Sequence, residues 1–123
     1  MAGEQVLVVE DNELNMKLFR DVLESSGYRT LEATTGSEAI DLAANHSPDL
    51  VLMDVQLPDL DGVEALRRLR ADGRTSALRV LAVTAQAMQG DRERFLRAGF
   101  DGYVAKPVDI VALLGTVRHH CDT

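Results

Sequence analysis

Two short runs of apolar residues constrain most strongly what this chain can fold into, because neither run alternates with polar residues. Gln5-Val6-Leu7-Val8-Val9 ends on Glu10 and Asp11, and Leu50-Val51-Leu52-Met53 ends on Asp54. Continuous apolar runs of this length are typical of strands covered on both faces, as in the middle of a parallel sheet. Each run therefore predicts a buried strand with acids at its carboxyl end, which is the edge where ligands bind in open α/β sheets. The alternative for Asp54 alone is an acid that leaves the core to meet water or cap a turn.

The remaining pattern predicts three more strands and a helix after each strand. The strands are expected over residues 28–33, 79–84 and 102–105. Helices are expected from Asn12 to Gly27, from Thr34 or Thr35 to a point before Pro48, and from Gly62 through Leu69. Two more are expected before Gly99 and over the last residues, with a loop or a loose helical turn over residues 85–90. The first helix would turn Leu14, Leu18, Phe19, Val22 and Leu23 inward, and the last would use Ile110, Val111, Leu113, Leu114 and Val117 as its apolar side. Strict alternation of strands and helices predicts a single doubly wound α/β domain with a parallel five-stranded sheet and helices on both faces.

Length and composition narrow the class of protein. The 123 residues are expected to form one domain, residues 1–123, and the net charge of -7 disfavours nucleic acid as a direct partner because phosphate binding needs a basic surface. No apolar run approaches the roughly 20 residues that span a bilayer, and the first residues lack the features of a signal peptide. The lone Cys121 fits a reducing compartment, so we expect a cytoplasmic protein without a membrane partner.

Five side chains able to do chemistry stand at predicted strand ends: Glu10, Asp11, Asp54, Thr84 and Lys106. A parallel sheet brings those ends to one edge. Carboxylates gathered there repel each other by about 4 kcal/mol per pair at about 4 Å and an effective dielectric constant near 20, so the cluster needs either raised pKa values or cations. Lys106 supplies one, and Mg2+ is a suitable second because it binds carboxylate and phosphate oxygens. An acid, a hydroxyl, a lysine and Mg2+ together suit phosphoryl transfer to a carboxylate.

These residues resemble the receiver domain of two-component response regulators, the CheY-like family. The matching segments are Val8-Val9-Glu10-Asp11-Asn12, Leu52-Met53-Asp54-Val55-Gln56-Leu57-Pro58, Asp61-Gly62, Val83-Thr84-Ala85 and Ala105-Lys106-Pro107, in order along the whole chain. In detail the chain is similar to single-domain DivK-type regulators. The resemblance implies the flavodoxin-like (βα)5 fold with strand order 2-1-3-4-5. It also implies a bacterial source.

The resemblance implies a role for each matching residue. Asp54 is expected to accept a phosphoryl group from a sensor histidine kinase or a histidine phosphotransfer protein. The expected Mg2+ ligands are Asp11, Asp54 and the backbone carbonyl of Gln56, with Glu10 acting through water. Thr84, Lys106 and Tyr103 are expected to bind the phosphoryl group or to move in response to it, and Pro107 is expected to follow a cis peptide bond.

The implied activity is that of a stand-alone signalling switch, which catalyses only its own phosphorylation and dephosphorylation. Its downstream protein partner is expected on the face formed by the fourth helix, the fifth strand and the fifth helix, around Arg92, Phe95, Phe100, Tyr103, Ile110 and Leu114, some of which belong to the core. Two alternatives stay open at this stage. One is a haloacid-dehalogenase-like aspartyl phosphatase, and the other is a degenerate receiver that binds partners without phosphorylation.

Overall fold

The computed structural model describes residues 3–85 and 91–121, so residues 86–90 of the expected loop lie outside the described residues. Over these ranges strands and helices alternate as the sequence predicts. The elements are β1 (Gln5–Val9), α1 (Glu13–Ser25), β2 (Arg29–Ala33), α2 (Gly36–His46), β3 (Leu50–Asp54), α3 (Gly62–Ala71), β4 (Val80–Thr84), α4 (Asp91–Ala98), β5 (Gly102–Ala105) and α5 (Ile110–Cys121). The strands form one parallel sheet in the order β2-β1-β3-β4-β5, which confirms the predicted fold class and strand order.

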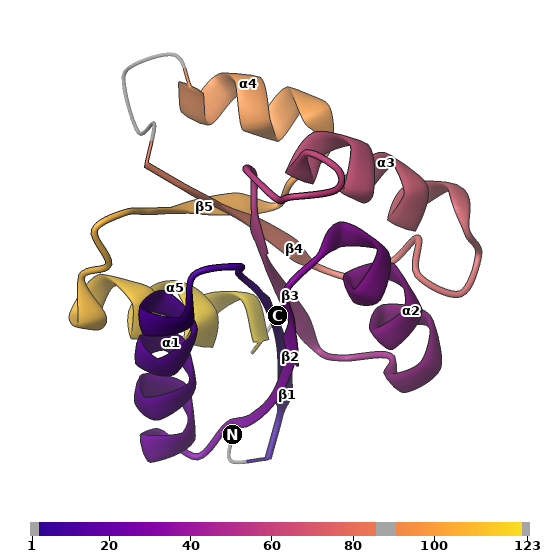
Figure 1. Cartoon of the computed structure of the whole chain (residues 1–123). Coiled ribbons are helices and arrows are strands. Elements are labelled where there is room, and N and C mark those ends of the chain that lie inside the picture. Colours follow the sequence, from indigo (N-terminus) through magenta and orange to yellow (C-terminus); the bar gives the residue numbers. More distant parts are fainter. Residues whose placement is uncertain (1–2, 86–90, 122–123) are drawn as a thin grey trace.

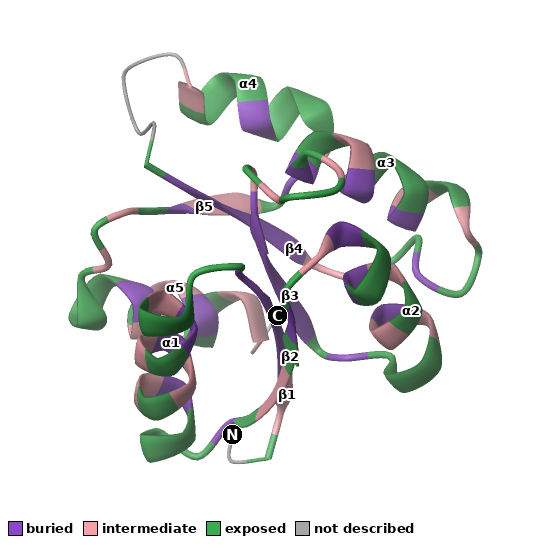
Figure 2. Cartoon of the chain, in the orientation of Figure 1, coloured by how far each residue is buried: buried purple, intermediate pink, exposed green. Residues whose placement is uncertain are grey.

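Helices cover both faces of the sheet (Figure 1). α1 and α5 lie on one face, and α2, α3 and α4 lie on the other. Alternate strand residues divide between two apolar clusters, so that Val8 and Leu52 face α1 and α5 while Val9 and Met53 face the other three helices. Since both faces are covered, β3 and β4 are buried from end to end, and β1 is buried from Val6 onward (Figure 2). This explains why their sequences do not alternate.

The apolar faces of α1 and α5 are narrower than predicted. Leu14 is 80% exposed and Val111 is 81% exposed, and Ile110 is also largely outside the core. Of the predicted apolar residues, α1 buries Phe19 and Leu23, together with Met16, which was not among them, and α5 buries Leu113 and Val117. At 3.6 residues per turn Leu14 points away from the helix face that carries Met16. Leu14 is therefore exposed, although its spacing in the sequence matches that of the apolar residues.

The start of β2 differs from the sequence prediction, and the structure decides between the two residues predicted to cap α2. Tyr28 is buried but precedes β2, because its amide donates to the carbonyl of Leu23 (3.1 Å) at the end of α1. α2 is capped by Thr35 rather than Thr34, since the Thr35 side chain accepts from the amide of Glu38 (3.1 Å). Within the described ranges, no helix is both long enough and apolar enough to cross a membrane.

Candidate functional site

The ends of β1 and β3 bring three carboxylates together. Val8 and Leu52 are register partners in these neighbouring strands, and two residues further along each chain come Glu10 and Asp54 on the same side of the sheet. Glu10 is 1% exposed and Asp54 is 4% exposed, whereas Asp11 is exposed. One oxygen of each of the three carboxylates lies within 4.8 Å of the others. The expected acidic cluster therefore exists at this edge of the sheet.

Lys106 points into this cluster from the end of β5. Its backbone amide donates to the carbonyl of Thr84 (2.8 Å), and its peptide bond to Pro107 is cis. The Lys106 Nζ donates to Asp54 Oδ2 at 3.0 Å. The same ammonium lies 2.8 Å from Glu10 Oε1 and forms an ion pair with it. One cation thus serves two buried carboxylates.

The pKa values of Glu10 and Lys106 are both shifted upward, Glu10 by burial and Lys106 by the carboxylates around it. Burial raises the pKa of Glu10, while Lys106 and the amide of Asn12, which donates to Glu10 Oε2 at 3.2 Å, act against burial. Burial acts to lower the pKa of Lys106, but the carboxylates of Glu10 and Asp54 outweigh it and the pKa is raised. Lys106 is therefore held as an ammonium, and Glu10 is ionised less readily than an ordinary glutamate.

The loop that follows β3 folds back on the end of the strand. The amide of Gln56 donates to Asp54 Oδ1 (2.9 Å), and the amide of Gly62 donates to the carbonyl of Val55 (2.9 Å). Gln56 and Asp61 form an isolated antiparallel bridge, and the Asp61 side chain caps α3 by accepting from the amide of Glu64 (2.8 Å). The Gln56 backbone is thus fixed beside the acidic cluster.

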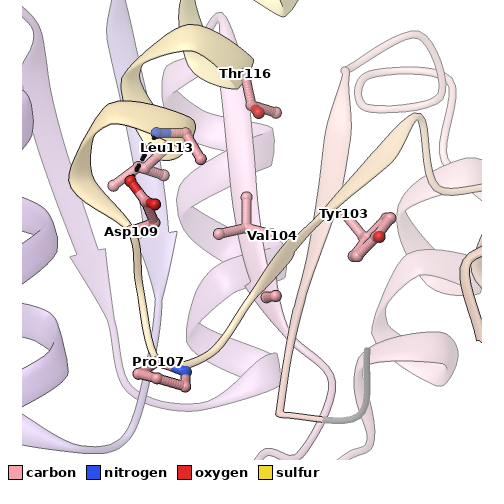
Figure 3. Close-up of a pocket in the computed structure, with 8 residues that line it drawn as sticks. Tyr103, Val104, Pro107, Asp109, Leu113 and Thr116 are labelled. Atoms are coloured by element: carbon pink, nitrogen blue, oxygen red, sulfur yellow. Dashed lines mark hydrogen bonds between the residues drawn. The ribbon is translucent and has the colours of Figure 1, made fainter. Parts of the chain in front are cut away.

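Thr84 and Tyr103 lie on the strands between the cluster and α4. Thr84 is buried at the end of β4, one residue beyond Val83, the register partner of Asp54. Tyr103 is half-buried in β5 and packs against the apolar cluster that includes Phe95 of α4. Figure 3 shows the Tyr103 ring on the opposite side of the β5 ribbon from Leu113 of α5. Tyr103, Leu113 and six other residues line a groove of about 300 Å3 between β5 and α5.

The donors gathered at the strand ends fit Mg2+. All three side chains offer carboxylate oxygens, which Mg2+ prefers, and the net negative charge of three acids against one lysine favours a divalent cation. Glu10 and Asp11 also line an open groove of about 480 Å3 that extends along α1, so solvent reaches the cluster. Asp61 is not among the grouped acids of the described residues, and its side chain is used by α3.

Sequence reasoning did not find two backbone donors of the site, the amides of Asn12 and Gln56. They donate to Glu10 Oε2 and Asp54 Oδ1 respectively. Any residue except proline offers an amide, so residue type carried no signal for them. Each amide reaches the carboxylate two residues before it because the chain turns at the end of the strand.

Comparisons with known proteins agree with this geometry. The family model of the response regulator receiver domain matches residues 6–118. The polar-differentiation response regulator DivK of Brucella abortus is 47% identical over 117 residues, which cover 95% of each chain. Among solved structures, the receiver domain of the sensor histidine kinase PA1611 from Pseudomonas aeruginosa PAO1, which has a magnesium ion in its active site cleft, superposes with a TM-score of 0.90 at 38% identity, covering 99% of this chain and 100% of that one. A CheY-like receiver domain protein from Methanospirillum hungatei JF-1 gives a TM-score of 0.87 at 28% identity, covering 98% and 95%.

Proposed function

The chain belongs to the response regulator receiver family, and we propose that it is a signalling switch in which Asp54 is the phosphoacceptor. The observation that carries the proposal is the position of Asp54. The residue is 4% exposed at the end of β3, with the Lys106 ammonium 3.0 Å from its carboxylate and the acids Glu10 and Asp11 beside it. A buried acid that pairs with one cation and lies beside two further acids able to bind a divalent ion is suited to receive a phosphoryl group.

The proposed donor is a phosphohistidine on a sensor histidine kinase or a histidine phosphotransfer protein. One carboxylate oxygen of Asp54 attacks the phosphorus atom, and the phosphorus–nitrogen bond breaks. The electron pair of that bond stays on the imidazole nitrogen, and Asp54 becomes an acyl phosphate. Water later attacks the phosphorus atom, the bond between phosphorus and the carboxylate oxygen breaks, inorganic phosphate leaves, and the carboxylate of Asp54 is restored.

The residues that would hold Mg2+ are Asp11, Asp54 and the backbone carbonyl of Gln56, with Glu10 acting through water. The ion, when bound, neutralises charge on the phosphoryl oxygens during transfer. Lys106 already pairs with Asp54, and after transfer its ammonium binds a phosphoryl oxygen. The magnesium ion in the similar PA1611 receiver domain supports this assignment.

We propose that Thr84 and Tyr103 transmit the change. The phosphoryl group brings about -1.5 to -2 charges and three acceptor oxygens to a buried edge, which favours inward rotation of the Thr84 hydroxyl. Tyr103 then moves toward the space beside Thr84, and the surface of α4, β5 and α5 changes with it. The half-buried position of Tyr103 in β5, the strand that pairs with β4 and its terminal Thr84, supports this route.

The downstream partner is proposed to be a protein that binds the α4, β5 and α5 face. On this face Arg92 and Ile110 are exposed and Leu114 is half-buried, whereas Phe95 and Phe100 belong to the core. The net charge of -7 favours protein partners over nucleic acid, and we place the switch in the cytoplasm, without a membrane partner.

The two alternatives have less support. A haloacid-dehalogenase-like phosphatase needs its nucleophile on the first strand and an acid two residues later, but Asp54 ends β3 and Gln56 occupies the second position. A degenerate receiver would lack part of the site, whereas acids, threonine and lysine are all present here at the strand ends.

A pair of small phosphate compounds tests the proposal. Phosphoramidate carries a phosphorus–nitrogen bond like that of phosphohistidine, and we expect it to label the protein at Asp54 in the presence of Mg2+. p-Nitrophenyl phosphate, a phosphate monoester, should not be hydrolysed over many turnovers. Repeated turnover of the monoester without labelling by phosphoramidate would contradict the switch and support the phosphatase.

A further inference from the structure

Asp59 ties the loop between β3 and α3 to the first turn of α2. Its Oδ1 accepts from the amide of Gly36 (2.7 Å). Its Oδ2 accepts from the amide of Ser37 (3.0 Å) and from the hydroxyl of Ser37 (2.8 Å). These bonds join segments that are 22 and 23 residues apart in the chain.

α2 does not need Asp59 in order to begin. Thr35 caps the helix by accepting from the amide of Glu38, and the Glu38 carboxylate accepts in return from the amide of Thr34 (2.8 Å). The Thr35 cap and the bond of Glu38 to Thr34, the residue before the cap, satisfy the helix start with local residues. Asp59 binds the two amides that the local cap does not reach. A carboxylate in that place is favourable because it meets the positive end of the helix dipole.

An apolar contact reinforces the same connection. The side chain of Leu60, which packs against the core, lies over Gly36. A Cβ atom at position 36 would be 2.8 Å from Leu60 Cδ1, so a larger residue there would displace the Leu60 side chain from this approach. Polar and apolar contacts therefore hold the tip of the loop on α2 at adjacent residues.

The other end of this loop belongs to the functional site. Gln56 donates its amide to Asp54 Oδ1, and the bridge between Gln56 and Asp61 closes the loop below its tip. A shift of the tip would therefore move the Gln56 backbone relative to Asp54. Groups that orient the ligands of a metal ion commonly change its affinity by roughly 10- to 100-fold when they are removed.

We propose that Asp59 is a positioning residue for the Mg2+ site, because its bonds to α2 hold the loop in the conformation that aims the Gln56 carbonyl at the ion. This inference rests on the proposed function, which assigns that carbonyl to Mg2+. Asp59 itself does not touch the ion. It acts through the loop, so it should affect the affinity for Mg2+ more than the chemistry of Asp54.

The test compares Mg2+ affinity in matched variants by following backbone amide signals during a titration with MgCl2. Asp59→Ala should raise the dissociation constant of Mg2+ roughly tenfold. Labelling of Asp54 by acetyl phosphate should then need correspondingly more Mg2+ for half of its maximal rate, with the rate at saturating Mg2+ within about twofold of wild type. Ser37→Ala removes one of the donors to Asp59 and should give a smaller shift in the same direction.

Thr35→Ala is the control. It removes the local cap of the same helix and should lower the melting temperature about as much as Asp59→Ala does, but it leaves the loop contacts in place and should not change the affinity for Mg2+. An unchanged dissociation constant in Asp59→Ala, or an equal shift in Thr35→Ala, would overturn the inference. If the wild-type protein bound Mg2+ but was not labelled at Asp54, the proposed function would be contradicted. The Mg2+ dissociation constants of wild type, Asp59→Ala and Thr35→Ala would still show whether Asp59 positions the Mg2+ site.

Discussion

The ammonium of Lys106 lies 3.0 Å from Asp54 Oδ2, although the two residues are 52 positions apart in the chain. The contact exists because β3, β4 and β5 are parallel neighbours whose carboxyl ends meet at one edge. Lys106 also pairs with Glu10 at 2.8 Å, so it is the counter-ion of two buried acids. The same contact stabilises the folded chain and places a cation where a transferred phosphoryl group would lie.

Lys106→Met should therefore destabilise the protein without Mg2+ by about 2–4 kcal/mol at neutral pH, since it leaves Glu10 and Asp54 buried without their cation. Excess Mg2+ should recover part of this loss, because the ion replaces the missing charge. Urea unfolding with and without MgCl2 measures both effects. Lys17→Met is the control, because Lys17 pairs with Asp21 on the exposed surface of α1 and should change stability by less than about 1 kcal/mol. Equal losses in the two variants would contradict the account of Lys106.

Glycine is required at position 62 but not at position 115. A Cβ atom at position 62 would lie 2.7 Å from the carbonyl oxygen of Asp54 and 2.7 Å from the Cα of Val55, and neither backbone atom can move without shifting the site. Gly62→Ala should cost about 2 kcal/mol and slow the labelling of Asp54. Gly115→Ala enters open space in α5 and should stabilise the protein by about 0.5–1 kcal/mol. Thermal unfolding of both variants checks the contrast, and a stabilised Gly62→Ala variant would refute the close approach.

Arg70 joins α3 to the segment that precedes β4 and to the segment that precedes β5. Its guanidinium donates to the carbonyls of Ser76 (3.1 Å), Leu78 and Gly99 (3.1 Å), and it pairs with Asp101 (3.1 Å). Arg70→Ala should destabilise the protein by about 1–3 kcal/mol, because three carbonyls lose their donor. Arg70→Lys should recover little of the loss, since an ammonium lacks the planar fork that reaches several acceptors.

Arg67→Ala is the control for the Arg70 variants. Within the part of the chain that the structure describes, Arg67 pairs with Glu64 alone, and its side chain is well exposed. Its loss should be below about 1 kcal/mol in the same urea titration. Full rescue of Arg70 by lysine would show that charge alone, rather than the set of carbonyl contacts, holds these segments together.

The bonds of Asp59 should appear in the pH dependence of stability. Hydrogen bonds from the Gly36 amide and then from Ser37 lower the pKa of Asp59 from 3.8 to about 2. A carboxyl whose pKa is lowered by folding contributes stability above its unfolded pKa and loses that contribution as pH falls toward its folded pKa. The difference in urea midpoint between wild type and Asp59→Asn should therefore be constant above about pH 5 and narrow between about pH 4 and about pH 2. A difference that does not change over this range would contradict the assigned hydrogen bonds.

The sheet and the acidic cluster could be predicted because their signals are local. An apolar run followed by an acid occupies a few residues, and parallel strands place such ends together whatever the sequence between them. The helix starts at Asn12 and Asp61 could be anticipated for the same reason, since each cap bonds an amide three residues further on.

Other features depend on contacts that no local pattern records. Asp59 finds its donors on α2, and Arg70 finds acceptors beyond β4, so residue type alone did not indicate either partner. The exposure of Leu14 and Val111 likewise depends on where α1 and α5 meet the sheet. Apolar spacing gives the periodicity of a helix, but the packing of the whole domain decides which part of an apolar stripe is covered.

The central claim is that Asp54 accepts the phosphoryl group and needs Mg2+ to do so. Intact-mass measurement of wild type and Asp54→Asn after incubation with acetyl phosphate, with and without Mg2+, tests it most directly. The account predicts one phosphoryl adduct on wild type with Mg2+, and none without Mg2+ or on Asp54→Asn. No adduct on wild type, under conditions that label another receiver domain, would contradict the claim, and an adduct on Asp54→Asn would show that a different residue is the acceptor.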